Sequence, residues 1–340
     1  MSEPRIQKII IHRVGNEADN EPLALSNTLL AIDNDLSTLL CDYLIGAFKS
    51  ESSYHFSDSV DLNMNRVYSV VSECFDNPEL FLGSSEKLAS HLYNFSDDPH
   101  FKSSFLFVVY FVNYGIDRKA DAIGIFRVDN KDLFLTVEND GQGYDLNAIK
   151  GVNMKKLDKG CLIINAEREA GFYVSVVDNS AKSDGGFWID SFLCLSRRED
   201  NYFHTENAMI LCRSFLAEEL PKEYELNRAE QVSLLNKSID YFKNNQKFET
   251  DKFSSNVISN PEAIKLFEDY RQKFAVEREI GLEDSFEMNQ TAVKKNAKVF
   301  KSVIKLDKNF HIYVHGNREL IEQGKDNGGT FYKLYFSDES

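Results

Sequence analysis

Two lysine-rich segments are the residues of this chain whose type and spacing point most clearly to a chemical role. Residues 291–308 hold six lysines and one acidic residue, a net charge of +5, and residues 150–160 hold four lysines and one acidic residue, a net charge of +3. The whole chain carries a net charge of −15, so the remainder carries −23. Positive charge segregated in this way is typical of a surface that binds a polyanion. A solvated lysine-rich face would give the same pattern.

We predict that these lysines contact the phosphates of DNA. Lysine supplies charge without the bidentate base recognition that arginine offers, so the contacts would depend strongly on salt and weakly on sequence. Nearby aromatic residues such as Phe300, Tyr313 and Tyr335 could stack on unpaired bases, although aromatic residues in strands more often belong to a core. The predicted DNA-binding residues are Lys294, Lys295, Lys298, Lys301, Lys305, Lys150, Lys155 and Lys156.

The other candidate sites lack the residue spacing that catalysis or cofactor binding requires. No Cys-x-x-Cys pair occurs, and His311 and His315 would lie about 13 Å apart along a strand, too far to share a metal ion. Residues 141–143 read Gly-Gln-Gly, but Leu146 stands where a dinucleotide-binding motif has its third glycine. Cys194 lies in an apolar run, which predicts a buried and unreactive thiol. We therefore predict a protein that is not an enzyme and that has no metal and no cofactor.

A metal-dependent nuclease is the less favoured enzymatic alternative. It needs carboxylates and a lysine on adjacent strands, which Asp178 with Lys182, or Glu138 with Lys150, would supply. The acidic residues around 138–145 are better explained as a solvated loop, because charged side chains mostly stay in water. Such pairings also arise by chance in a chain with 54 acidic and 39 basic residues.

Composition and length place the chain among soluble globular proteins with about two domains. It has 340 residues, of which 42% are hydrophobic and 27% are charged. The longest apolar run, 105–112, is too short to cross a membrane and predicts a buried strand. The N-terminus lacks the pattern of a secretion signal, and five widely spaced cysteines suit a reducing compartment. We expect a cytoplasmic protein with no membrane contact.

Hydrophobic periodicity predicts helices first and strands after them in the first half of the chain. Apolar residues recur at helical spacing from 32 to 48, with Asp33 available as a cap, and a second helix should follow Pro78. Short runs rich in Phe, Val and Ile predict strands, and short connections such as 129–132 favour an antiparallel meander. The predicted strands are 105–114, 122–128, 133–137, 161–164 and 172–177.

The second half should begin with long helices over 187–243. Asn260 and Pro261 then mark the start of a further helix, and strands should follow near the C-terminus. The sequence therefore predicts an α+β fold with an antiparallel sheet core and flanking helices in residues 1–245. It predicts a linker at 246–259 and a small C-terminal α+β module at 260–340, which contains the basic segment 291–308.

The C-terminal residues also carry a family resemblance. Residues 291–316, TAVKKNAKVFKSVIKLDKNFHIYVHG, and residues 331–336, FYKLYF, resemble the C-terminal signature of NdpA/YejK-type nucleoid-associated proteins, in particular their Bacteroidetes-like branch. Residues 6–12, 65–68 and 187–193 are similar to other parts of the same family. Together these segments span nearly the whole chain.

The resemblance implies a bacterial, cytoplasmic protein of the nucleoid that binds DNA with little sequence preference and contacts type II topoisomerases. It implies no catalytic residues and no agreed DNA-contact motif, so the lysine assignments rest on charge alone. Two functions follow from the sequence. The first is a non-enzymatic DNA-binding homodimer, joined through apolar helices between Phe187 and Phe242. The alternative is a protein-interaction module that regulates a type II topoisomerase or acts in a defence system.

Overall fold

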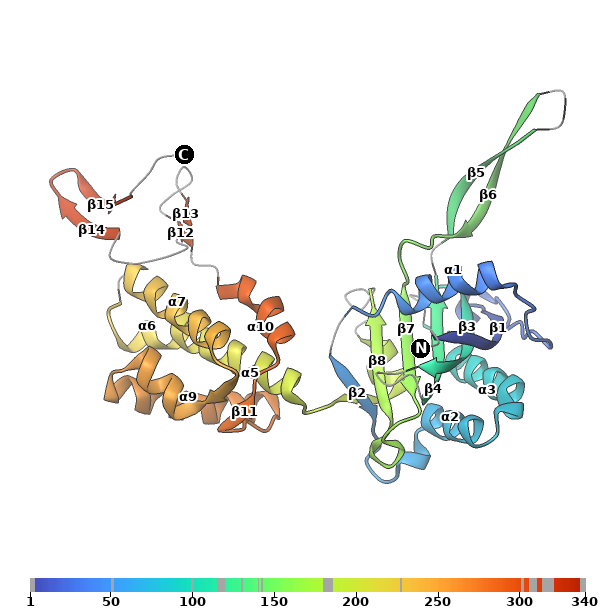
Figure 1. Ribbon diagram of the computed structural model, residues 1–340, viewed down its shortest axis with the longest axis horizontal. Helices are drawn as coiled ribbons and strands as arrows, with labels where there is room; N and C mark the ends of the chain where they lie inside the picture. The colour runs from blue at the N-terminus through green and yellow to red at the C-terminus, as the bar shows by residue number, and fades with distance from the viewer. Residues whose placement is uncertain are drawn as a thin grey trace. The chain divides into compact units, whose positions relative to one another are not determined.

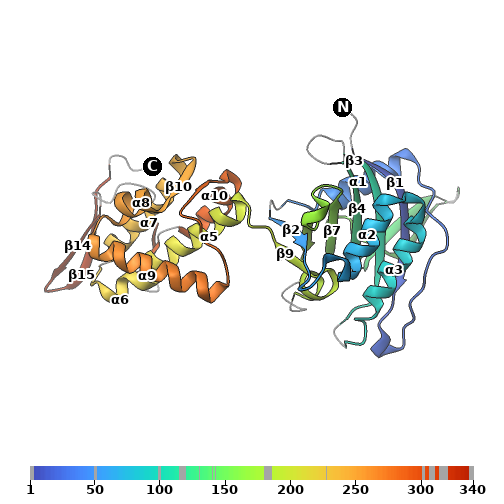
Figure 2. The same ribbon diagram turned by 90° about the horizontal axis from the view of Figure 1, so that it is seen from below.

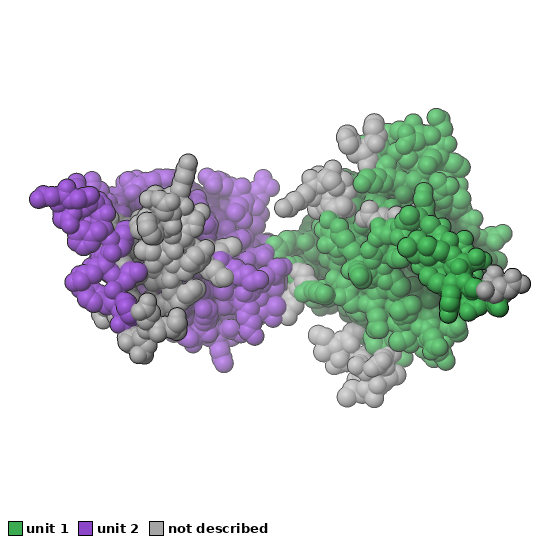
Figure 3. Space-filling model, turned by 90° about the horizontal axis from the view of Figure 1, so that it is seen from above, with its two compact units in different colours: residues 1–198 green, residues 199–340 purple. Residues whose placement is uncertain are grey.

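The chain forms two compact units, residues 1–198 and 199–340, which are coloured separately in Figure 3. Each unit has its own buried hydrophobic core. The computed structural model describes residues 4–49, 52–98, 101–114, 120–129, 131–139, 141, 143–179, 186–226, 228–300, 303–305, 311–313 and 321–336.

The first unit is built on a seven-stranded sheet in which every neighbouring pair of strands is antiparallel. The order across the sheet is β1-β3-β4-β7-β8-β2-β9. The strands are β1 (Arg5–Val14), β2 (Ser53–Phe56), β3 (Ser104–Tyr114), β4 (Ala120–Val128), β7 (Lys159–Ile164), β8 (Tyr173–Asp178) and β9 (Leu195–Arg197).

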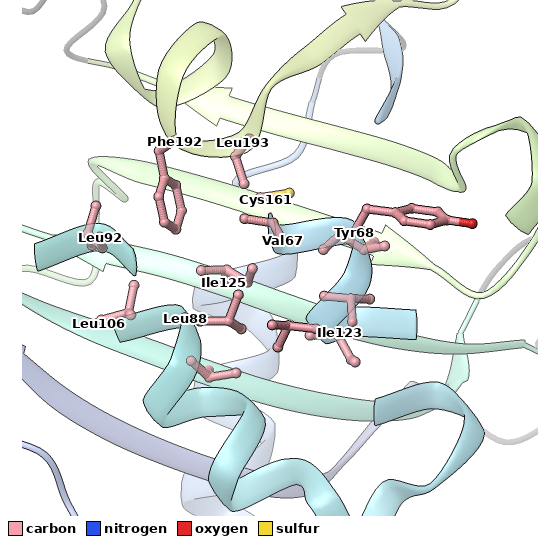
Figure 4. Close-up of a cluster of buried hydrophobic side chains, with 14 of the residues drawn as sticks. Val67, Tyr68, Leu88, Leu92, Leu106, Ile123, Ile125, Cys161, Phe192 and Leu193 are labelled. Atoms are coloured by element: carbon pink, nitrogen blue, oxygen red, sulfur yellow. The ribbon is translucent and has the colours of Figure 1, made fainter. Parts of the chain in front are cut away.

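Helices cover both faces of this sheet, α1 (Asn34–Ile45) on one face, and α2 (Arg66–Asp76) and α3 (Phe81–Tyr93) on the other (Figure 1). Figure 2 shows α2 and α3 side by side against the strands. Along β3, Leu106 and Val108 join the cluster beneath α2 and α3, whereas Phe107 and Val109 join the cluster beneath α1. Figure 4 shows Leu106 among the first of these clusters. Burial on both faces explains why this strand is a continuous apolar run.

Polar caps set the starts of α1 and α2, and the sequence predicted the first of them. The Asp33 carboxylate accepts a hydrogen bond from the Leu36 backbone N–H at 2.8 Å, and Asn65 accepts one from Tyr68 at 3.0 Å. Asn65 also donates from Nδ2 to the Leu193 carbonyl at 3.0 Å, which ties the start of α2 to a distant segment. The short helices of this unit are η1 (Glu17–Asp19), η2 (Leu62–Met64), η3 (Pro78–Leu80), η4 (Arg168–Ala170) and η5 (Trp188–Leu193).

One hairpin leaves the sheet, and we call it the arm. It consists of β5 (Lys131–Asn139) and β6 (Tyr144–Val152), which pair only with each other and extend away from the rest of the first unit (Figure 1). The predicted meander through 129–132 is wrong at this point, because β4 pairs with β7 and the chain between them forms the arm. The strand β6, which the sequence reading missed, has mixed polarity and no long apolar run.

The described part of the second unit is mainly helical, with three short two-stranded ribbons. The ribbons pair β10 with β11, β12 with β13 and β14 with β15. The elements are α5 (Asn201–Ser214), η6 (Phe215–Glu219), α6 (Leu220–Glu223), α7 (Arg228–Asn244), β10 (Lys247–Glu249), α8 (Thr250–Phe253), η7 (Ser254–Ile258), α9 (Pro261–Arg278), β11 (Ser285–Glu287), α10 (Gln290–Asn296), η8 (Ala297–Phe300), β12 (Val303–Lys305), β13 (His311–Tyr313), β14 (Ile321–Asp326) and β15 (Gly329–Leu334).

The boundary between the units differs from the predicted one. The structure divides the chain after residue 198, and the segment predicted as a linker, 246–259, forms β10, α8 and η7. Phe248 and Phe253 from this segment are buried in the core of the second unit. Most residues of this segment are polar, but its few large apolar residues are buried in the core.

The apolar helices also pack differently from the expected dimer interface. Met209, Leu216 and Phe242 are buried in the second unit's own core, so the chain itself covers this face. The cap at Asn260 is confirmed, since its side chain accepts hydrogen bonds from Glu262 and Ala263 at the start of α9. The sheet with flanking helices and the helical second unit confirm the predicted α+β class. Among the described residues no helix is both long and apolar enough to span a membrane.

Candidate nucleic-acid interface

The root of the arm carries a pocket lined by three lysines, Lys49, Lys155 and Lys156, which we call the pocket lysines. The pocket has a volume of about 310 Å³, and Asp42 and Tyr43 of α1 also line it. Lys155 and Lys156 lie in the turn that follows β6, and Lys49 lies just after α1. All three lysines are exposed, and none forms an ion pair with any residue that the structure describes. Three positive charges and one carboxylate therefore surround a hollow that is open to an anion.

Hydrogen bonds hold the turn that presents two of these lysines. Asn153 accepts a hydrogen bond from the Lys155 backbone N–H at 2.9 Å, and Asn179 donates to the Leu157 carbonyl at 2.7 Å. The Tyr43 hydroxyl donates to the Lys156 carbonyl at 3.4 Å. Burial, reinforced by the nearby charge of Asp158, raises the pKa of Tyr43 to about 12. Tyr43 therefore stays a neutral donor near neutral pH and adds no negative charge to the pocket.

Buried ion pairs lie beneath the root of the arm. Lys159, at the start of β7, is fully buried and places its Nζ 2.8 Å from Oδ1 of Asp178 on β8. Arg127, at the end of β4, places its Nε 2.8 Å from Oδ1 of Asp129. The Asp158 carboxylate accepts a hydrogen bond from the Asp129 backbone N–H at 2.9 Å, which joins the outgoing and returning chain segments of the arm. This arrangement holds the arm and the pocket lysines in place on the sheet.

Because of Asp129, the stability of the folded protein should depend on pH. Burial raises the pKa of Asp129 to about 6, against an opposing effect of the Arg127 charge. Because the unfolded chain loses this proton near pH 3.9, the native state binds more protons between about pH 4 and 6. The contribution of this group to stability therefore decreases as pH rises through that window, by up to about 3 kcal/mol.

We expect Asp129→Asn to remove this dependence, since the amide oxygen can still face Arg127 but cannot ionise. The stability of the variant relative to the unaltered protein should rise between pH 4 and 7, measured by urea denaturation at each pH. The difference between the two proteins cancels the titration of other carboxyl groups. A difference that stays constant over this range would show that Asp129 is already ionised at pH 4 in the native state.

The second group of lysines lies on α10 and η8 of the second unit. Lys294 and Lys295 are in the last turn of α10, and Lys298 follows in η8; all three are exposed. The buried residues Ala292 and Val293 anchor α10, and Lys295 places its Nζ 5.8 Å from the ring centroid of Tyr202 on α5. We call Lys294, Lys295 and Lys298 the α10 lysines. Their position at a helix C-terminus suits the negative end of the helix dipole.

The structure places the predicted lysines in two separate groups. Lys155 and Lys156 lie in the first unit, and Lys294, Lys295 and Lys298 lie in the second. Lys150 lies on β6, within the arm, and is exposed. Lys301 lies outside the described residues, and for Lys305 the structure gives the backbone in β12 only. The sequence reading missed Lys49, which carried no signal because it is remote in sequence from Lys155. Of the aromatic candidates, Phe300 is buried in the core, whereas Tyr335 is 40% exposed.

The described residues do not bring together the groups that the nuclease alternative needs. Glu138 lies opposite Asp145 near the tip of the arm, while Lys150 lies opposite Leu133, about 17 Å away along the strand. Asp178 is paired with buried Lys159, and Lys182 lies outside the described residues. Within the described ranges, no group of three His, Cys, Asp or Glu residues could hold a metal ion.

The sequence also drew attention to two histidines and one cysteine. His311 lies in β13, as expected for a strand, and His315 is outside the described residues. Cys194 was expected to be buried but is exposed, because it ends η5 with a left-handed backbone, φ 50°. Partial burial and the nearby carboxylates of Asp58 and Asp190 raise the pKa of Cys194, so its thiol stays protonated and weakly nucleophilic.

Comparison with known proteins gives one result that covers most of the chain. The model of the family described as nucleoid-associated protein YejK matches residues 10–329. A search of curated proteins found no match. The family match runs through both compact units, including the arm, the pocket lysines and the α10 lysines. The chain therefore belongs to the family of the nucleoid-associated protein YejK.

Proposed function

We propose that this nucleoid-associated protein binds DNA directly through the phosphate backbone, with the pocket lysines and the α10 lysines as the contacts. Binding of this kind needs no catalytic group, no metal and no cofactor. It would depend little on base sequence, because ammonium groups recognise phosphate charge and not the pattern of donors and acceptors on base edges. The proposed site of action is the bacterial nucleoid in the cytoplasm.

The observation that carries this proposal is the state of the pocket lysines. Acidic residues outnumber basic ones in the chain by 54 to 39, and several exposed lysines are paired with them. Lys87, Lys222 and Lys252, for example, are paired with Glu73, Glu219 and Glu249. The pocket lysines form no such pair with described residues and surround a hollow instead. A cluster of three lysines beside a single carboxylate, in an otherwise acidic protein, favours an anionic partner.

The acidic remainder of the chain gives this binding its expected character. Net negative charge repels DNA at long range, so binding should depend on the two local lysine groups. Each lysine that neutralises a phosphate releases counterions, and log affinity should fall linearly with log salt concentration. Steep salt dependence with little preference between duplexes of different sequence is the expected behaviour.

The test changes all three pocket lysines, Lys49→Gln, Lys155→Gln and Lys156→Gln, in the full chain. Affinity for a random-sequence duplex is measured at several salt concentrations, with and without magnesium. If each lysine contacts one phosphate, the slope of log affinity against log salt should become shallower by about 3. Affinity near 0.1 M salt should fall on the order of 100-fold.

A matched control removes the same charge from paired lysines. Lys87→Gln, Lys222→Gln and Lys252→Gln together change the net charge equally, and we expect little change in slope. Equal slopes for the two triple variants would refute the role of the pocket. No binding by the unaltered protein at low salt would favour association through a protein partner such as a topoisomerase, and magnesium-dependent cutting would favour a nuclease.

A further inference from the structure

We propose that the pocket at the root of the arm binds a phosphate monoester, the group carried by a nucleoside monophosphate and by the 5′ end of a DNA strand, in preference to the phosphate diesters within a strand. This inference deepens the proposed function and rests on it for the role of the pocket lysines. It goes further by naming the chemical form of the phosphate and by giving a role to the rest of the pocket wall.

The pocket has the size of a small-molecule site. Its volume is about 310 Å³, at the lower end of the range of about 300–1,000 Å³ that such sites span. A diester within a strand is attached to a sugar on both sides, so the strand must pass across the mouth of a hollow of this size. A terminal phosphate is attached on one side only and enters with its sugar behind it. The shape therefore favours a monoester.

The charge of the pocket also matches a monoester. Three lysine ammonium groups and the carboxylate of Asp42 leave a net charge of +2 on the pocket wall. A phosphate monoester carries about −1.5 to −2 at pH 7, whereas a diester carries about −1. Lysine suits such a ligand, because its ammonium binds phosphate as a point charge. A monoester thus neutralises the pocket, and a diester leaves it with excess positive charge.

The remaining wall of the pocket suits the nucleoside part of the ligand. Asp42 is exposed, and its carboxylate forms no ion pair with any residue that the structure describes. Gly46 and Ala47 follow the last residue of α1, and the C-terminus of a helix carries partial negative charge. These acceptors can pair with the hydroxyl and amino groups of a nucleoside, whereas a diester offers them no donor. Met154, which is 39% exposed, adds an adaptable apolar surface for a sugar or base.

Hydrogen bonds hold the pocket in shape before a ligand binds. Asn153 accepts from the Lys155 backbone N–H at 2.9 Å, and its Nδ2 donates to Oδ2 of Asp132 at 2.5 Å, which joins the turn after β6 to the start of β5. The side chain of Tyr43 is buried, and its hydroxyl donates to the Lys156 carbonyl at 3.4 Å. A turn fixed in this way loses little conformational freedom on binding, which favours affinity for a small ligand.

The main test compares two ligands that differ only in the ester. Calorimetry of the full chain measures binding of deoxyadenosine 5′-monophosphate and of its 5′-methyl ester, which keeps the base and sugar but has one charge fewer. The monophosphate should bind more tightly, by about 10-fold. Lys155→Gln with Lys156→Gln should weaken its binding on the order of 100-fold, and the paired-lysine control, Lys87→Gln with Lys222→Gln, by less than about twofold.

The variant Asp42→Asn separates recognition of the nucleoside from recognition of the phosphate. It removes a negative charge, so inorganic phosphate should bind equally or more tightly. The monophosphate should lose about 10-fold in affinity relative to inorganic phosphate, because a neutral amide oxygen is a weaker acceptor than a carboxylate. An equal gain for both ligands would overturn the role of Asp42 in holding the nucleoside.

Two duplexes of one sequence, with 5′-phosphate or 5′-hydroxyl ends, identify the source of the monoester. Tighter binding of the phosphorylated duplex would assign the pocket to DNA ends. Equal binding, with displacement of DNA by the monophosphate, would assign it to free nucleotides, and both results support the proposal. Equal binding of the monophosphate and its methyl ester would overturn it, as would an undiminished preference in the variant that lacks Lys155 and Lys156.

Closed circular DNA separates this test from that of the proposed function, because a closed circle has no strand ends. Salt-dependent binding of the circle, without a preference for the monophosphate over its methyl ester, would overturn this inference alone. Binding of the monophosphate without binding of the circle would overturn the proposed contact with internal phosphates and support the pocket as a monoester site.

Discussion

Replacing Lys159 by Met should lower the free energy of unfolding of residues 1–198 by about 3–5 kcal/mol. Lys159 is fully buried, and its ammonium lies 2.8 Å from the carboxylate of Asp178, whose side chain is 5% exposed. Methionine fills a similar volume but cannot balance the charge. The variant therefore leaves a buried carboxylate without its cation, which is far more costly than loss of a surface pair.

Fluorescence makes this measurement specific to the first unit. Trp188 is the only tryptophan of the chain and is completely buried in the core of residues 1–198. Its emission during urea denaturation of the full chain therefore reports on that unit alone.

The control replaces both members of the pair, Lys159→Met with Asp178→Leu. Removing both charges leaves neither member of this pair behind, so the double variant should recover most of the lost stability. A loss below about 1 kcal/mol for Lys159→Met alone would mean that water or another cation compensates Asp178 in solution. The same variants should alter DNA binding only if the root of the arm changes shape, because neither residue is exposed.

The second prediction concerns which fragments of the chain fold on their own. A fragment of residues 199–340 should fold with a cooperative thermal transition, whereas a fragment of residues 260–340 should not fold. The reason is that aromatic residues on the two sides of residue 260 share one core. The ring of Phe267 lies 5.0 Å from that of Phe215 and 5.8 Å from that of Phe253, and Phe286 stacks on Phe248 at 5.2 Å.

Circular dichroism of the two fragments checks this expectation. A third fragment, residues 1–198, serves as the control for cutting at the boundary and should retain the buried fluorescence of Trp188. Cooperative unfolding of residues 260–340 alone would contradict the shared core and restore the predicted C-terminal module. Within residues 199–340, Phe242→Ala should cost about 3–5 kcal/mol, since its side chain is fully buried.

Local patterns in the sequence were sufficient for many elements of this fold. Asp33 and Asn260 cap the helices that they were predicted to cap. The apolar run 105–112 became the buried strand β3, and the class of the fold was correct. These features depend on residues within one turn or one strand, so hydrogen-bonding capacity and hydrophobic spacing predict them directly. The family resemblance was likewise confirmed.

Features of the fold that depend on long-range contacts could not be predicted from local sequence patterns. Strand-forming residues at 131–139 do not indicate which strand they will pair with, and β5 pairs with the unpredicted β6 outside the sheet. The polar segment 246–259 looked like a linker, but Phe248 and Phe253 are core residues. The sheet itself closes by pairing β4 with β7, and Phe248 and Phe253 pack against residues distant in sequence. Local propensity carries no information about such partners.

The division between sequence and structure is clearest at the lysines. The sequence by itself determined that two short segments of an acidic chain carry a net positive charge, because local charge follows directly from the order of the residues. Only the tertiary structure placed Lys49 beside Lys155 and Lys156 around one pocket and left one face of the arm apolar and exposed. Both outcomes follow from how the chain leaves and re-enters the sheet between β4 and β7, where strand pairing and the buried charges of Asp129, Asp158 and Lys159 fix its path.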